Sequence, residues 1–300
     1  MDQKITNHSL SFEHQKKLVA FDDFFIFLQT NNYSKKTIYN YEKDLGLFAY
    51  FLDLKKITVD RLDKRFINEF KAYLASDDRK TSTMEYNAVK TLGSASINRC
   101  LSAVRAYIRF LIDNDYKVLV MPDQFKMVKR ERPHPNIAEM DELVRLIESP
   151  STLEQNVEIS SRNRAMLEVL FSTGMRISEL LSLNKRDLSD TGRILISGKG
   201  RKQRFVYLTE RAVAYIEQYL KLRNDTQEAM FTPTKGKNIN EKQRRISPNY
   251  LQERIKFYRE TLRINVPISA HTLRHGFATY LVEEGASPAA IQILLGHESL

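Results

Sequence analysis

A short segment near the end of the chain holds three side chains suited to phosphate chemistry. His271, Arg274 and His275 occur within five positions, and at about 100° per residue they fall on one stripe of a helix. An arginine can grip a phosphate through two parallel hydrogen bonds, and imidazoles exchange protons near neutral pH. We therefore expect this stripe to bind and protonate a phosphate group. A zinc site is disfavoured, because the metalloprotease pattern needs glutamate directly after the first histidine and Thr272 stands there.

Two earlier segments carry further positive charge. Arg176 follows Gly174 at the predicted start of a helix, and Glu179 lies one turn later on the same face. A cation at a helix N-terminus opposes the helix dipole, so we expect an anion to accompany Arg176. Lys199 stands between two glycines in GKGRKQR, where the missing side chains allow a backbone to approach closely. The spacing of this loop does not match a Walker phosphate loop.

Each segment alone fits a surface or core feature as well as a site, but their order along the chain is informative. TGMRISEL, GKGRKQR, HTLRHGFAT and LLGH follow one another in this sequence. Together they resemble the tyrosine recombinase, or phage integrase, family, and specifically its Xer-like bacterial branch. The resemblance implies supporting roles for Glu179 and His275. The catalytic set that it implies is Arg176, Lys199, His271, Arg274 and His297.

The same resemblance implies a reaction and a partner. In the family, a tyrosine attacks a DNA phosphodiester, forms a 3′-phosphotyrosyl link and exchanges strands through a Holliday junction. The implied partner is a double-stranded DNA recombination site, bound by a homotetramer of the complete protein, whereas the chain as given is expected to be a monomer. We expect no metal, no cofactor and no membrane partner.

The nucleophile is where the sequence departs from the family pattern. The family's tyrosine follows the histidine of LGH, and no tyrosine follows His297 in these 300 residues. Tyr280 falls opposite His271 on its helix, so we expect it in the core, and Tyr250 and Tyr258 lack a motif context. We therefore expect the chain to lack its nucleophile and to be inactive in cleavage. A non-catalytic DNA-binding or regulatory protein is the alternative.

The composition agrees with a nucleic-acid partner. A net charge of +10 and a pI near 9.5 suit a polyanion, because each neutralised phosphate releases counterions, although solvated lysines would give the same balance. We expect a cytoplasmic protein, since no apolar run could span a bilayer, no signal-peptide pattern opens the chain and Cys100, expected to be buried, has no disulfide partner. The expected DNA contacts are Lys35, Lys36, Arg99, Arg105, Lys129, Arg130, Arg201 and Lys202.

Helical periodicity organises the first part of the chain. Apolar residues recur at helical spacing over residues 21–28, after a predicted N-cap at Ser34, over Asp63–Ala75 and over Ser94–Asp115. Four such helices predict a bundle. Within it, Ser34–Tyr41 and Ser96–Arg105 resemble the family's core-binding, SAM-like domain.

A proline-containing basic stretch separates this bundle from a second domain. We predict a DNA-binding domain over 1–120, a linker over 121–135 and a catalytic domain over 136–300, cut short before the tyrosine and the last helix. A solvated linker and one that lies along a phosphate backbone both fit. Strands at Arg193–Ser197 and Arg204–Leu208 predict a hairpin among helices. The expected fold is therefore mainly α with a small antiparallel sheet, the second domain being mixed α/β. Its predicted helices are Ala138–Ile147, Ser161–Thr173, Ile177–Leu183, Glu210–Leu222, Pro248–Arg263, Thr272–Glu284 and Pro288–Leu295.

Overall fold

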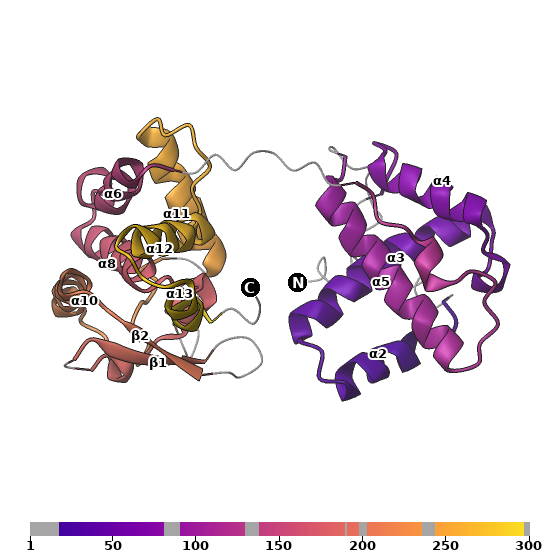
Figure 1. The fold of residues 1–300 in the computed structure, drawn as a ribbon, viewed down its shortest axis with the longest axis horizontal. Coiled ribbons are helices and arrows are strands. Elements are labelled where there is room, and N and C mark those ends of the chain that lie inside the picture. The colour runs from indigo at the N-terminus through magenta and orange to yellow at the C-terminus, as the bar shows by residue number, and fades with distance from the viewer. Residues whose placement is uncertain are drawn as a thin grey trace, which may run out of the picture. The chain divides into compact units, whose positions relative to one another are not determined.

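A computed structural model describes residues 18–80, 91–129, 138–189, 191–197, 203–235 and 244–296 of the chain. The chain forms two compact units, Met1–Pro133 and His134–Leu300, each with its own hydrophobic core (Figure 1). Part of the predicted linker packs with the first unit, because Pro122–Gln124 forms a 3-10 turn and the Phe125 ring is buried in that unit's core. The proposed domain boundaries stay predictions.

In its described residues, the N-terminal unit has four α-helices: α2 (Phe21–Thr30), α3 (Lys35–Lys55), α4 (Lys64–Ala75) and α5 (Ser94–Asp113) (Figure 1). A further 3-10 turn spans Val59–Arg61. The predicted N-cap is confirmed, since Ser34 Oγ accepts a hydrogen bond from the Thr37 amide at 3.1 Å, and Asp63 caps α4 in the same way. Because these caps satisfy amides that lack helical partners, the local sequence alone fixes where α3 and α4 begin.

Aromatic rings fill the core of this unit. The rings of Phe48 and Phe70 meet edge to face with centroids 5.3 Å apart, and Phe51 stacks on Tyr73 at 4.8 Å. Such pairs add to the large apolar area that each ring removes from water. Cys100 is fully buried among these helices, as its place in the helical pattern predicted.

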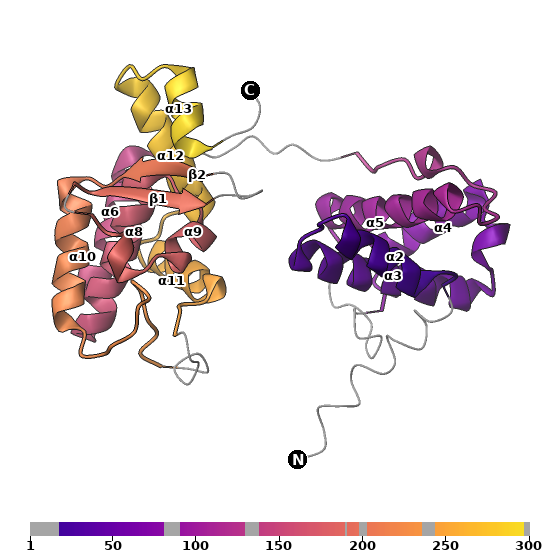
Figure 2. The same ribbon diagram turned by 90° about the horizontal axis from the view of Figure 1, so that it is seen from below.

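The C-terminal unit is helical around one antiparallel hairpin, which confirms the predicted fold class (Figures 1 and 2). Strands β1 (Arg193–Ser197) and β2 (Gln203–Tyr207) pair in a register that sets Leu195 opposite Phe205. β2 begins and ends one residue before the predicted strand. Figure 2 shows the hairpin beside α12 and α13, and β2 contacts α13. The helices are α6 (Met140–Glu148), α7 (Pro150–Leu153), α8 (Val157–Thr173), α9 (Ile177–Ser182), α10 (Glu210–Leu222), α11 (Pro248–Thr261), α12 (Ala270–Glu283) and α13 (Pro288–Leu295), with a 3-10 turn at Lys185–Asp187.

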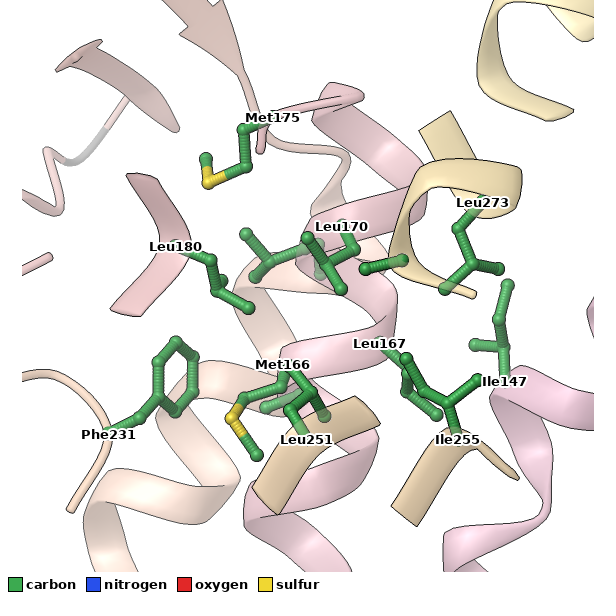
Figure 3. Close-up of a cluster of buried hydrophobic side chains, with 14 of the residues drawn as sticks. Ile147, Met166, Leu167, Leu170, Met175, Leu180, Phe231, Leu251, Ile255 and Leu273 are labelled. Atoms are coloured by element: carbon green, nitrogen blue, oxygen red, sulfur yellow. The ribbon is translucent and has the colours of Figure 1, made fainter. Parts of the chain in front are cut away.

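Helix α8 runs through the middle of this unit and is buried on nearly all sides. Met166, Leu167 and Leu170 contribute side chains to a core that other helices close around it (Figure 3). α8 starts four residues earlier than predicted, because the Asn156 side chain accepts a hydrogen bond from the Ile159 amide and caps it there. A hydrophobic pattern cannot reveal that first turn, since its residues are polar or partly exposed.

Gly174 ends α8 in a left-handed conformation, with φ +57°. A Cβ atom at this position would lie 2.5 Å from Phe277 Cδ1 and 2.8 Å from Leu295 Cδ2. Glycine therefore serves two purposes, since it turns the chain and lets α12 and α13 approach it closely. This turn delivers Arg176 to the start of α9. No helix in the described ranges is long and apolar enough to cross a membrane.

Candidate active site

Arg176 stands at the N-cap of α9, directly after the turn at Gly174. The Arg176 amide donates to Glu179 Oε2 at 2.8 Å, and its guanidinium Nη1 donates to Glu179 Oε1 at 3.0 Å. The predicted conflict between an arginine and the helix dipole is thus relieved by a carboxylate from the first turn of the same helix. The Arg176 side chain remains 38% exposed. It can therefore reach a further anion from solvent.

Glu179 is buried, at 5% exposure, and it is shared between two arginines. Besides Arg176, it accepts two hydrogen bonds from Arg204 of β2, from Nη1 to Oε1 at 3.0 Å and from Nη2 to Oε2 at 2.8 Å. Burial raises the pKa of the Glu179 carboxyl, but the hydrogen bonds from Arg204 and from the Arg176 amide lower it more, so the pKa lies below its ordinary value. Glu179 is therefore an anion at neutral pH.

Arg274 lies on the inner side of α12 and is almost wholly buried. Its Nη1 donates to the Gly174 carbonyl at 2.7 Å, and its Nη2 donates to the Leu295 carbonyl at 2.5 Å. Burial, and then the charges of Arg176 and Arg204, lower the pKa of Arg274 to about 10. The guanidinium therefore holds the end of α8 and the end of α13 together while keeping its charge at neutral pH.

The two histidines of α12 are exposed, whereas Arg274 is buried, so the predicted stripe differs in exposure along its width. The Nε2 atoms of His271 and His275 are 3.0 Å apart. Burial, and then the charges of His275, Arg274 and Arg176, lower the pKa of His271 below its ordinary value of 6.5. The His271 imidazole is thus mostly neutral at pH 7 and able to accept a proton.

Several predicted residues lie outside the described parts of the chain: Lys199, His297, Arg130, Arg201 and Lys202. Their roles stay predictions. Of the two supporting residues, Glu179 contacts the arginines and His275 contacts His271.

The predicted DNA contacts of the N-terminal unit fall into two groups. Lys35, Lys36 and Lys129 are exposed, and Lys36 Nζ lies 4.9 Å from the centre of the Tyr39 ring. Arg99 and Arg105 instead pair with carboxylates, Arg99 with Asp44 at 2.7 Å and Arg105 with Asp123 at 2.8 Å. A phosphate would compete with those carboxylates for the two arginines, whereas it would meet the lysines directly.

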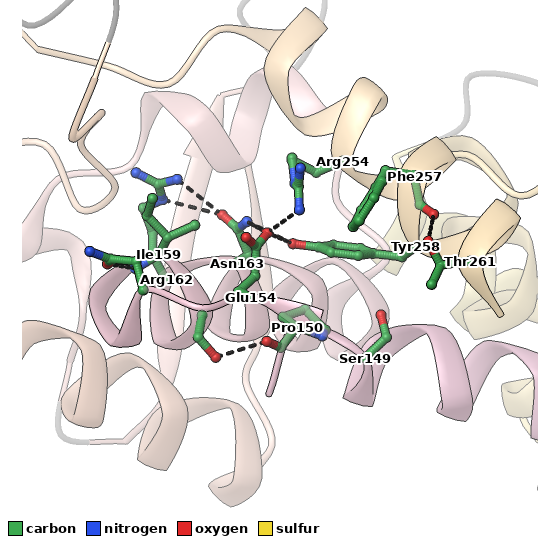
Figure 4. Close-up of polar contacts among 12 residues, drawn as sticks. Ser149, Pro150, Glu154, Ile159, Arg162, Asn163, Arg254, Phe257, Tyr258 and Thr261 are labelled. Atoms are coloured by element: carbon green, nitrogen blue, oxygen red, sulfur yellow. Dashed lines mark hydrogen bonds and ion pairs between the residues drawn. The ribbon is translucent and has the colours of Figure 1, made fainter. Parts of the chain in front are cut away.

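The tyrosines considered as substitute nucleophiles have other surroundings. Tyr258 is buried, accepts a hydrogen bond from Asn163 at 2.7 Å and donates to Glu154 (Figure 4). Tyr250 receives hydrogen bonds from Arg162 and Asn163 in the same network. Tyr280 is 41% exposed, so its predicted place in the core was wrong. The helical wheel gave its face, but not how far neighbouring elements cover it.

Arg204 was not among the predicted site residues, although it ends the GKGRKQR segment and begins a predicted strand. Arg204 and Val206 point to the same side of β2, and Val206 is buried in the core. A charged residue on the apolar face of a predicted strand is the signal that could have identified it. For metals, no group of three or more histidine, cysteine, aspartate or glutamate side chains in the described residues could hold an ion.

Comparisons with known proteins find phage integrases and tyrosine recombinases. The phage integrase family matches residues 137–300, and the N-terminal SAM-like domain of phage integrases matches residues 21–115. Tyrosine recombinase XerD of Oceanobacillus iheyensis is 32% identical over 292 residues, which cover 94% of this chain and 90% of that protein. Tyrosine recombinase XerC of Pelobacter propionicus is 34% identical over 282 residues, covering 90% and 83%.

The fold also has a counterpart among solved structures. A lambda integrase dimer bound to a COC′ core site superposes with a TM-score of 0.71 over 93% of each chain, at 15% identity. At that identity, the likeness bears on the fold alone.

Proposed function

The chain belongs to the phage integrase family of tyrosine recombinases, and on this basis we propose that it acts in site-specific DNA recombination. Strand cleavage and rejoining would pass through a 3′-phosphotyrosyl intermediate and a Holliday junction. The substrate of this chain would be a duplex recombination site. In the complete assembly four copies act together, in the cytoplasm where the DNA lies.

An excess of positive charge around one carboxylate carries this proposal. The charges of Arg176 and Arg204 both act on Arg274, and Glu179, which contacts Arg176 and Arg204, partly offsets them. Such a cluster has a net positive charge in a partly shielded place, where a phosphate anion would relieve the repulsion. Besides burial and His275, the charges of Arg274 and Arg176 lower the pKa of His271, so a proton acceptor lies near the proposed phosphate-binding position.

The roles of the residues follow from this arrangement and from the family. Arg176 and the N–H groups of Arg274 that the carbonyls do not use stabilise charge on the non-bridging oxygens as it develops. His271 takes the proton of the attacking tyrosine, and Lys199 gives a proton to the 5′-oxygen that leaves. His297 donates a hydrogen bond to the phosphate. No step needs a metal, because cationic side chains provide the positive charge.

The nucleophile is the finer part of the proposal. We infer that a polypeptide of these 300 residues binds its site but does not cleave it. Tyr250 and Tyr258 are engaged in the network around Asn163, and Tyr280 lies nine residues after His271, on the opposite face of α12. On a nicked duplex that traps covalent intermediates, we expect no denaturant-resistant adduct. An adduct would contradict this part and implicate an internal tyrosine.

A binding experiment tests the phosphate site without requiring cleavage. A target duplex is first selected from a random-sequence library with the whole chain, and each phosphate is then replaced singly by a neutral methylphosphonate. We expect one phosphate per strand whose neutralisation weakens binding far more than the rest, about 10- to 100-fold, because charge-assisted hydrogen bonds are lost there. Arg176→Gln should remove this excess, whereas Arg211→Gln, whose partners Glu148 and Glu168 are not site residues, should keep it.

The same titrations separate the two candidate functions. Binding to the selected duplex should weaken steeply as salt rises, since lysines and arginines displace counterions from the DNA. Uniform small effects at every phosphate would instead favour the non-catalytic DNA-binding or regulatory protein. Binding that does not change with salt would contradict both.

A further inference from the structure

We propose that Arg204 is a positioning residue for the phosphate site: it occupies Glu179, so that the guanidinium of Arg176 stays available to the DNA phosphate. The inference rests on the proposed function and adds a residue to it. Arg204 also holds the end of α13, from which the chain continues to His297. One side chain of the hairpin would then set two separate parts of the site.

The described contacts of the Arg204 guanidinium all lie inside the protein. Its side chain is only 9% exposed, two of its nitrogens bind Glu179, and its Nε donates to the Leu294 carbonyl at 2.9 Å. All three guanidinium nitrogens are therefore engaged inside the protein. Arg176, in contrast, contacts Glu179 through one side-chain nitrogen and is more than a third exposed.

Competition for the Glu179 oxygens explains how Arg204 would act. Oε1 accepts from both arginine side chains, and Oε2 accepts from Arg204 and from the Arg176 amide. A carboxylate that lost Arg204 would have acceptor sites free for both arms of the Arg176 guanidinium, in the bidentate geometry that such pairs favour. Arg176 would then turn from solvent towards Glu179, and its charge would be neutralised before DNA arrives.

The end of α13 provides the second contact. The last carbonyls of a helix have no helical partners and carry the negative end of its dipole. Arg204 binds the Leu294 carbonyl, and Arg274 binds the next one, of Leu295. Gly296 then turns with φ +66°, where an added Cβ would lie 3.0 Å from Arg204 Cδ. The two arginines therefore hold the last turn of α13 at the Leu294 and Leu295 carbonyls.

Methylphosphonate binding on the selected duplex tests this role. In the unchanged protein, the neutral linkage at the most sensitive phosphate should weaken binding about 10- to 100-fold. In Arg204→Met this penalty should fall to about threefold or less, because Arg176 is no longer available to the phosphate. Arg211→Met is the matched control: it also removes an arginine that pairs with two glutamates, and the full penalty should remain.

A double variant tests whether Arg204 acts on Arg176 through Glu179. If Arg204 acts by occupying Glu179, then adding Arg204→Met to Glu179→Gln should change the methylphosphonate penalty no further, since no carboxylate remains to capture Arg176. Arg204→Lys, which keeps the charge but loses the bidentate contact, should give an intermediate penalty. This variant also decides the matter if Arg204→Met does not fold.

The possible outcomes distinguish a failure of the role inferred for Arg204 from a failure of the proposed function. A full penalty in both folded Arg204 variants would overturn the positioning role and leave the recombinase site standing. An absent penalty in the unchanged protein would instead contradict the proposed phosphate site itself. A penalty lost equally in the Arg204 and Arg211 variants would show a general effect of stability and would also overturn the inference.

Discussion

Asp44 in the N-terminal unit and Glu179 in the C-terminal unit are both buried carboxylates that contact arginine, and their pKa values shift in opposite directions. In the N-terminal unit, Asp44 is 2% exposed and receives one side-chain contact, from Arg99 at 2.7 Å. Burial raises its pKa more than Arg99 lowers it, and the pKa rises to about 6. In the C-terminal unit, Glu179 is buried to a similar degree, but its pKa falls below the ordinary value.

The number of donors explains this difference. Desolvation is the largest single influence on both carboxylates and opposes their charge. Asp44 has one arginine, itself half exposed, to offset that cost. Glu179 has two arginines and a backbone amide, which together exceed it. Several donors from different elements therefore hold the pKa of Glu179 below its ordinary value in spite of burial, whereas the single arginine beside Asp44 does not do so.

The largest effect on stability is expected from removing the charge of Glu179, which accepts more hydrogen bonds than Asp44. Glu179→Gln should lower the free energy of unfolding of the C-terminal unit by about 3–5 kcal/mol at pH 7, because Arg204 would be left shielded without its counter-charge. Urea unfolding, with hydrogen exchange to assign the unit, measures this loss. Glu148→Gln is the control, since Glu148 also pairs with arginine but is half exposed, and about 1 kcal/mol or less is expected.

The pH dependence of that loss has a definite sign. Because the folded pKa of Glu179 is below 4.5, its stabilisation is complete above pH 4.5 and is lost as pH falls further. The difference between the unchanged protein and Glu179→Gln should therefore shrink below pH 4.5. A difference that stayed constant down to pH 3 would mean that the charge of Glu179 does not stabilise the fold.

The opposite pH dependence is expected in the N-terminal unit. The folded pKa of Asp44, about 6, exceeds the ordinary 3.8, so its contribution is present below pH 3.8 and is lost as pH rises towards 6. Relative to Asp44→Asn, the unchanged protein should lose on the order of 3 kcal/mol of stability between pH 4 and pH 7. Asp123→Asn, at an exposed ion pair, should keep this dependence. If the stabilities of the unchanged protein and of Asp44→Asn run parallel between pH 4 and pH 7, the pKa of Asp44 is not raised by folding and the contrast with Glu179 fails.

The smallest effect should come from the single partner of Asp44. Arg99 lowers the pKa of Asp44 through its charge and its hydrogen bond, so Arg99→Gln should raise that pKa above 6. Carbon-13 NMR titration of the Asp44 carboxyl group measures the change. An unchanged pKa would show that Arg99 is not held by Asp44 in solution and is free to contact DNA as the sequence predicted.

Local sequence predicted the helices and part of the site. The N-cap at Ser34 is read from a single residue, and the Arg176–Glu179 contact follows from a spacing of three along one helix. The close approach of His271 and His275 follows from a spacing of four. These features depend on neighbours within about one helical turn, whose geometry the backbone fixes in advance.

Tertiary structure alone decided which side chains are buried and what they bind. Arg274 meets the carbonyl of Gly174, and Arg204 meets Glu179, across segments far apart in the chain. Helical spacing placed Arg274 beside the histidines but could not show that it turns inward, nor that Tyr280 is exposed. Periodicity states which residues share a face of an element, whereas the partner of that face depends on how distant elements pack. The motifs could therefore be found by sequence, but the balance of charge that makes them a site is set by packing.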